Sequence, residues 1–178
     1  MLENIRRLSL MLVLIMVAAC TQPMLQDGTP QTFVVRDVTV DVASFTGVTG
    51  REIAVPPAQV AADVKAALEA SLARPGPQTA DLLIQLTSVQ LTSRGSAAAF
   101  GGNSRMTAVL SVRDAATGDV LIAPTQITGF SEFVRVPGVI GAATSPSPES
   151  DYRQTVDGFA ESVRNQLYGP VTGTASGA

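Results

Sequence analysis

The sequence contains no histidine, no tryptophan and a single cysteine among its 178 residues. Without histidine, the chain cannot form a Ser–His–Asp triad, an imidazole general base or a zinc site with imidazole ligands. One cysteine excludes an internal disulfide and a cysteine-ligated metal cluster. Aromatic residues make up only 4% of the chain, which argues against a stacking surface for single-stranded nucleic acid or sugars. We therefore expect no enzyme activity, no metal and no cofactor.

Charged residues are also few, and they suggest no reactive cluster. The formal net charge is −3, and no basic patch marks a nucleic-acid footprint. Asp37 and Asp41, with Glu52 nearby, are candidates for the paired carboxylates of a reactive site. The two aspartates share one face of a strand, however, and the simpler expectation is that this face is exposed to solvent. The segment 47–51 (GVTGR) lacks the lysine of a phosphate-binding loop. The segment 129–133 (GFSEF) lacks the second glycine of a nucleophile elbow.

The amino terminus has the organisation of a secretory signal. Arg6 and Arg7 form a short basic region, and residues 8–19 are apolar apart from Ser9. This run is shorter than the ~20 apolar residues of an ordinary transmembrane helix. A basic start, a short apolar middle and small residues at the end are typical of a signal peptide. The alternative is a core helix or an interfacial anchor, but residues 21–31 (TQPMLQDGTPQ) break the helical pattern at once.

Val17, Ala18, Ala19 and Cys20 resemble the lipobox of bacterial lipoproteins, in which an aliphatic residue and two small residues precede the cysteine. The resemblance implies cleavage before Cys20, a diacylglyceryl thioether on its sulfur and usually a third acyl chain on its new amino group. A single acyl chain binds a membrane marginally, whereas two or more anchor stably at about 0.8 kcal/mol per buried CH₂. The residue after the cysteine is Thr21, and in this position the sequence resembles the lipoproteins that are sorted to the outer membrane. We therefore expect an outer-membrane lipoprotein that faces the periplasm.

The remaining chain divides into a lipidated tether at residues 20–32, a folded part at 33–169 and a disordered tail at 170–178. Periodicity in the folded part predicts the order strand, helix, strand, strand, strand, helix. The predicted strands are 33–44, 80–93, 104–113 and 120–134, and the helices begin at Pro56-Pro57 and Ser147-Pro148. A change of parity between Leu86 and Val89 predicts a β-bulge near Thr87-Ser88.

This order predicts an α+β fold, a two-layer α/β sandwich with a four-stranded mixed sheet. Polar positions alternate along the strands, so one face of the sheet should be exposed and both helices should cover the other. The helix between the first two strands predicts that they are parallel, and the rest should form an antiparallel meander. The order resembles small envelope domains such as the amino-terminal domain of TolB and the lipopolysaccharide-assembly lipoprotein. It also resembles uncharacterised proteobacterial lipoproteins with a D-x-x-T-G hairpin, here Asp114 to Gly118.

Three predicted loops, at residues 45–55, 94–103 and 135–148, should emerge together at the end of the sheet far from the lipid. They carry four large apolar side chains: Phe45, Phe100, Val139 and Ile140. The simpler expectation is that these side chains fold back over the top of the core, because large exposed apolar patches are uncommon. The alternative is a docking surface for a partner.

Two classes of function are compatible with these features. The first is a non-catalytic accessory or assembly lipoprotein of the envelope that binds a protein partner through its loops or an edge strand. The second is a carrier or chaperone for an amphiphile in the periplasm, with a cleft between helices and sheet. In both cases the membrane contact is the lipid on Cys20, and neither nucleic acid nor metal is an expected partner.

Overall fold

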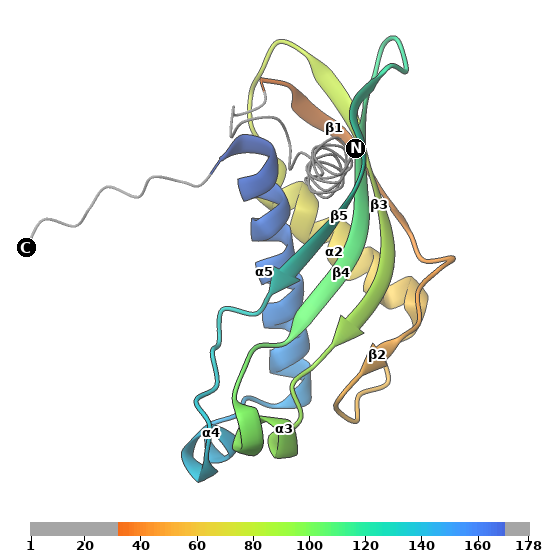
Figure 1. The fold of residues 1–178 in the computed structure, drawn as a ribbon. Helices are drawn as coiled ribbons and strands as arrows, with labels where there is room; N and C mark the ends of the chain where they lie inside the picture. The colour runs from red at the N-terminus through yellow and green to blue at the C-terminus, as the bar shows by residue number, and fades with distance from the viewer. Residues whose placement is uncertain (1–31, 170–178) are drawn as a thin grey trace, which may run out of the picture.

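The computed structural model describes residues 32–169, which form one open mixed sheet and four helices (Figure 1). The predicted signal peptide, the tail and all of the tether except Thr32 lie outside these residues. In chain order the elements are β1 (Val34–Asp41), β2 (Val48–Thr49), α2 (Pro57–Leu72), β3 (Thr79–Gln90), α3 (Arg94–Phe100), β4 (Arg105–Asp114), β5 (Val120–Phe130), α4 (Val139–Ala143) and α5 (Pro148–Tyr168).

The sheet has the order β1-β3-β4-β5, with the short β2 beside β3. β1 runs parallel to β3, whereas β3, β4 and β5 form an antiparallel meander, as the sequence predicts. The register of β3 against β4 shifts between Leu86 and Ser88, which confirms the predicted bulge. The bulge keeps Leu86 and Val89 on one buried face although their spacing in the sequence is odd.

The prediction of a four-stranded sheet is wrong, because the sheet has five strands. The additional strand, β2, lies within the predicted loop 45–55 and places Val48 beside Val89 and Thr49 beside Gln90. It therefore continues the edge that β1 forms along the first part of β3. Two residues are too few to leave an alternating pattern in a sequence, so periodicity cannot reveal such a strand.

The structure also has two short helices where the sequence predicts loops. α3 occupies most of the segment 94–103, and Ser93 caps it by accepting a hydrogen bond from the N–H of Ser96 at 3.0 Å. α4 lies within the segment 135–148. β5 ends at Phe130 rather than at Val134, and a backbone hydrogen bond just beyond its end joins the Ser131 N–H to the carbonyl of Ser104.

The two long helices, α2 and α5, cover one face of the sheet, as predicted, and the structure shows that they also pack against each other. Their inward stripes are buried in one core together with alternate residues of β3, β4 and β5. Ser147 caps α5 through a 3.2 Å hydrogen bond from the N–H of Ser150. The helix stripes are Val60, Val64, Leu68 and Leu72 in α2, and Tyr152, Val156, Phe159, Val163 and Leu167 in α5. The core thus lies between the sheet and these helices.

The hairpin between β4 and β5 is held by the carboxylate of Asp114. This carboxylate accepts hydrogen bonds from the side chain of Gln78 at 2.7 Å and from the N–H groups of Ala116 and Thr117 at 2.8 and 2.9 Å. The bond from Gln78, followed by the two backbone bonds, lowers the pKa of Asp114 to about 2. The D-x-x-T-G motif therefore serves to stabilise the turn between β4 and β5 in this chain.

Two glycines allow α5 to cross β5 at close range. A Cβ on Gly158 would lie 1.9 Å from the carbonyl oxygen of Phe130, and a Cβ on Gly129 would lie 2.3 Å from the Cα of Phe159. Both distances are too short for any side chain. Gly158 therefore has a packing role that outweighs its low helix propensity.

We expect the Gly158→Ala variant to be less stable than the wild type. Helix propensity alone predicts a gain of up to ~1 kcal/mol, whereas overpacking of a close contact costs about 1–3 kcal/mol. Urea unfolding followed by circular dichroism measures the difference. An Arg153→Ala variant, altered at an exposed position of the same helix, should change stability little. A stabilised Gly158→Ala variant would contradict the close helix–strand crossing.

Candidate functional site

The three segments that carry the predicted apolar residues meet at one end of the sheet, at the bottom of Figure 1. α3 and α4 lie against each other there, and the N–H of Gly138 donates to the carbonyl of Ala98 at 2.9 Å. Arg51 donates to the carbonyl of Pro146 at 2.8 Å, which joins the first segment to the third. The start of β1 and the β4–β5 hairpin lie at the opposite end, since Val34 is paired with Thr79.

The four predicted residues separate into two groups. Phe45 is half-buried and packs against the core, as expected. Phe100, Val139 and Ile140 are 82%, 83% and 72% exposed, so the expectation that they fold back over the core is wrong. The reason is that the short helix α3 buries Ala97 and directs Phe100 outward, while α4 carries the other two.

Two further apolar side chains, Val134 and Val136, are exposed on the segment between β5 and α4. We call Phe100, Val134, Val136, Val139 and Ile140 the loop-end surface. Monomeric proteins rarely expose many large apolar side chains in one region unless a binding site lies there. The loop-end surface is therefore the strongest candidate for a docking site in the described residues.

A buried ionic network lies behind the loop-end surface, centred on the carboxylate of Asp151. Oδ1 of Asp151 lies 2.6 Å from Nη2 of Arg135, and Oδ2 lies 3.3 Å from Nη1 of Arg51. The hydroxyl of Ser104 lies 2.9 Å from both carboxylate oxygens and donates to them. The side chains of Asp151 and Arg135 are fully buried, and that of Arg51 is 6% exposed.

The network contains two guanidinium groups and one carboxylate, which leaves a formal charge of +1 in a buried place. Arg135 is held by its ionic contact with Asp151 and by the ring of Phe133, whose centroid lies 5.5 Å from its Cζ. None of its three guanidinium nitrogens forms an aligned hydrogen bond to an acceptor among the described residues, so Nη2 is held to Asp151 by charge. Because the network joins the segment after β2, the segment after β5 and the start of α5, we infer that it fixes the position of the loop-end surface.

Sequence reasoning misses this network, because its members are far apart in the chain and each has a simpler local explanation. Asp151 fits the first turn of a helix, where carboxylates are common, and Arg51 follows a glycine-rich loop. One local signal is present: Arg135 stands between two valines in the run Val134-Arg135-Val136. A lone charge in such a run is compatible with a buried ion pair.

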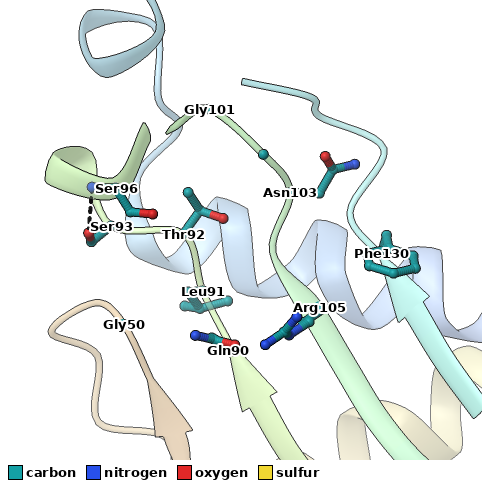
Figure 2. Close-up of a pocket in the computed structure, with 11 residues that line it drawn as sticks. Gly50, Gln90, Leu91, Thr92, Ser93, Ser96, Gly101, Asn103, Arg105 and Phe130 are labelled. Carbon is teal, nitrogen blue, oxygen red and sulfur yellow. Dashed lines mark hydrogen bonds between the residues drawn. The ribbon is translucent and has the colours of Figure 1, made fainter. Parts of the chain in front are cut away.

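A hollow of 410 Å³ lies on the exposed face of the sheet, beside α3. Figure 2 shows Gln90 and Arg105 next to each other on neighbouring strands, with Phe130 on the following strand. The loop after β2 closes one side, where Gly50 approaches so near that a Cβ would lie 1.9 Å from the carbonyl oxygen of Leu91. Five of the eleven lining residues carry neutral polar side chains, and Arg105 is the one formally charged residue.

The candidate carboxylates of the first strand each have a separate local contact. Oδ1 of Asp37 lies 3.7 Å from Nζ of Lys65, and Asp41 accepts a hydrogen bond from the N–H of Ala43 at 2.8 Å. Glu52 is exposed. Between residues 32 and 169, no cluster of three or more acidic, histidine or cysteine side chains is placed to hold a metal ion.

The predicted lipidation site, Cys20, and the lipobox residues Val17, Ala18 and Ala19 lie outside the described residues, so the anchor stays a prediction. Among the helices that the structure describes, none combines the length and the apolar character needed to cross a membrane.

No family model and no curated protein matches the sequence. Among solved structures, the chain is similar to a protein from Caulobacter crescentus described as "a putative lipoprotein", with 14% identity, a TM-score of 0.35 and coverage of 67% of this chain and 85% of that one. It is also similar to a Xanthomonas campestris protein described as DUF330, with 11% identity, a TM-score of 0.43 and coverage of 81% and 87%. A third structure, an uncharacterised protein, has 9% identity, a TM-score of 0.41 and coverage of 79% and 94%. At these values the likeness assigns neither a function nor a site.

Proposed function

We propose that the protein is a non-catalytic accessory lipoprotein of the cell envelope, anchored through Cys20, which binds a protein partner through its loop-end surface. The observation that carries this proposal is the exposure of Phe100, Val139 and Ile140 on two short helices that contact each other. Apolar side chains that are held outward by ordered backbone lose little conformational freedom when a partner covers them. They are therefore well suited to form the centre of an interface.

The position of this surface supports the same function. The described chain begins at the end of the sheet opposite α3 and α4. β4 spans ten residues, so the two ends of the sheet are separated by roughly 30 Å. A chain anchored at Cys20 would thus present its apolar side chains away from the anchor. In this arrangement the partner binds in the periplasm, and the lipobox resemblance with Thr21 favours the outer membrane.

The packing between helices and sheet favours partner binding over the carrier alternative. A carrier of the kind considered from the sequence would need a cleft between the two layers to hold an acyl chain. In the described residues that space is occupied by core side chains, among them Leu68, Leu86, Leu110 and Phe159, all at most 1% exposed. Binding an amphiphile there would require the core to open, which costs far more than docking at a surface that is already exposed.

A charge substitution at the loop-end surface tests the proposal. We expect a Phe100→Asp, Ile140→Asp double variant to fold normally but to lose a partner that co-purifies stoichiometrically with the wild-type chain from detergent-solubilised envelopes. Burying two carboxylates in an apolar interface costs several kcal/mol, which is enough to abolish a complex of moderate affinity. The measurement is quantitative mass spectrometry of the affinity-purified protein.

The matched control is a Val120→Asp, Leu121→Asp double variant. These two side chains are 53% and 37% exposed at the opposite end of the sheet. The control should retain the partner. Equal recovery of the partner with both double variants would overturn the assignment of the docking surface. Co-purifying lipid without a stoichiometric protein would favour the carrier.

A further inference from the structure

The hollow beside α3 has an unusual combination of shape and charge. Four segments surround it: the loop after β2, the end of β3, α3 with the glycines that follow it, and the adjoining ends of β4 and β5. Its volume of 410 Å³ is within the range of small-molecule sites. Its lining contains the guanidinium of Arg105 and no carboxylate. The hollow therefore has a positive formal charge in a protein whose net charge is negative.

The polar side chains that line the hollow have unused hydrogen-bonding capacity. Arg105 forms no ion pair between residues 32 and 169, and in the same range the side chains of Gln90, Thr92, Ser96 and Arg105 form no hydrogen bond to another residue. Figure 2 shows these four side chains gathered around the hollow from β3, the segment after it, α3 and β4. A ligand could thus bind to all four without breaking a bond within the protein.

The floor of the hollow is held in place from behind by the buried network. The N–H of Thr92 donates to the hydroxyl of Ser104 at 2.8 Å, and this hydroxyl donates to the carboxylate of Asp151. Asn103 is fixed by a 3.1 Å bond from its amide nitrogen to the carbonyl of Ser131. Because these bonds tie the two residues before Arg105 to the segments after β3 and β5, little ordering is required when a ligand binds.

From these observations we infer that the hollow is a binding site for a small anionic ligand, a carboxylate or a phosphate on a hydroxyl-rich body. The planar guanidinium of Arg105 can bind either anion through two parallel hydrogen bonds. Gln90, Thr92 and Ser96 match hydroxyl groups, because an amide and a hydroxyl can both donate and accept. Phe130 supplies an apolar wall. This site is separate from the loop-end surface and requires no protein partner.

Three probes of the same ring and different charge test this inference: glucuronate, glucose-6-phosphate and glucose. The full chain, labelled with ¹⁵N and purified in a non-ionic detergent, is titrated with each probe while amide chemical shifts are recorded. We expect saturable shifts at Gln90, Ser96 and Arg105 with at least one anionic probe, and a Kd at least about tenfold weaker for glucose, since the charge-assisted bonds are lost. Comparing glucuronate with glucose-6-phosphate shows which anion the site prefers.

The decisive variant is Arg105→Gln, with Arg113→Gln as its control. Arg113 is exposed on the same strand and the same face, eight positions away at the hairpin end. We expect the first variant to weaken binding of the anionic probe by about tenfold or more and the second to leave it within about twofold. Equal binding of glucose and the anionic probes, no saturable shift at the hollow, or equal losses in the two variants would each overturn the inference.

Discussion

A Cys20→Ser variant is expected to lose its lipid completely. Incorporation of labelled palmitate should fall to background, because serine offers no sulfur for the thioether that the lipobox resemblance implies. Any chain that is cleaved after Ala19 should then leave the membrane fraction. Each buried CH₂ contributes about 0.8 kcal/mol, so two long acyl chains supply on the order of 20 kcal/mol of membrane affinity. The acidic body of the protein offers no compensating attraction to anionic lipid.

A Thr21→Ser variant is the matched control, since it changes a neighbouring residue and preserves Val17 to Cys20. It should take up palmitate and sediment with membranes as the wild type does. If neither the wild type nor the Cys20→Ser variant takes up palmitate and both sediment with membranes, the lipid anchor is refuted. In that case the apolar run of residues 8–19 would have to hold the protein.

An Asp151→Ala variant is expected to be the most strongly destabilised of the variants of the folded part. It leaves the fully buried guanidinium of Arg135 and the nearly buried one of Arg51 without a counter-charge. The hydroxyl of Ser104 loses its acceptor as well. Removing one partner of a buried ion pair typically costs about 3–5 kcal/mol. Urea unfolding should therefore show a lowered midpoint, or no folded protein at all.

Asp157→Ala serves as the comparison, because Asp157 is exposed on the same helix and forms no ion pair in residues 32–169. Its stability should lie within about 0.5 kcal/mol of the wild type. A double variant, Arg135→Met with Asp151→Leu, removes the principal charge pair together and should recover part of the loss, since apolar replacement of a buried pair is often tolerated. A loss below about 1 kcal/mol for Asp151→Ala would contradict the buried network.

Long, regular elements of this fold are predictable from the sequence because burial imposes a period on them. Val60, Val64, Leu68 and Leu72 mark α2 by a repeat of four, and alternation marks β4. The bulge in β3 is also predictable, because the apolar residues change parity between Leu86 and Val89. In a strand every second residue must face the core, and in a helix every third or fourth residue must do so. The apolar residues of the sequence therefore repeat with these periods.

The remaining features depend on contacts between distant segments, which one sequence does not display. β2 exists because two residues meet the end of β3, and α3 packs against α4, where the N–H of Gly138 donates to the carbonyl of Ala98. All four apolar loop residues are identifiable in the sequence, but the exposure of three of them depends on these short elements. The hollow requires Gln90 and Arg105 to be paired across β3 and β4, although they are separated by 15 positions in the chain.

Site-specific photo-cross-linking in intact cells tests the docking proposal most directly. A photoreactive amino acid replaces Ile140 on the loop-end surface or Val120 at the opposite end, which are 72% and 53% exposed. The proposed function predicts that the Ile140 position gives one discrete cross-linked protein species, whereas the Val120 position does not. No cross-linked species at Ile140, or the same species in equal yield from both positions, would contradict it.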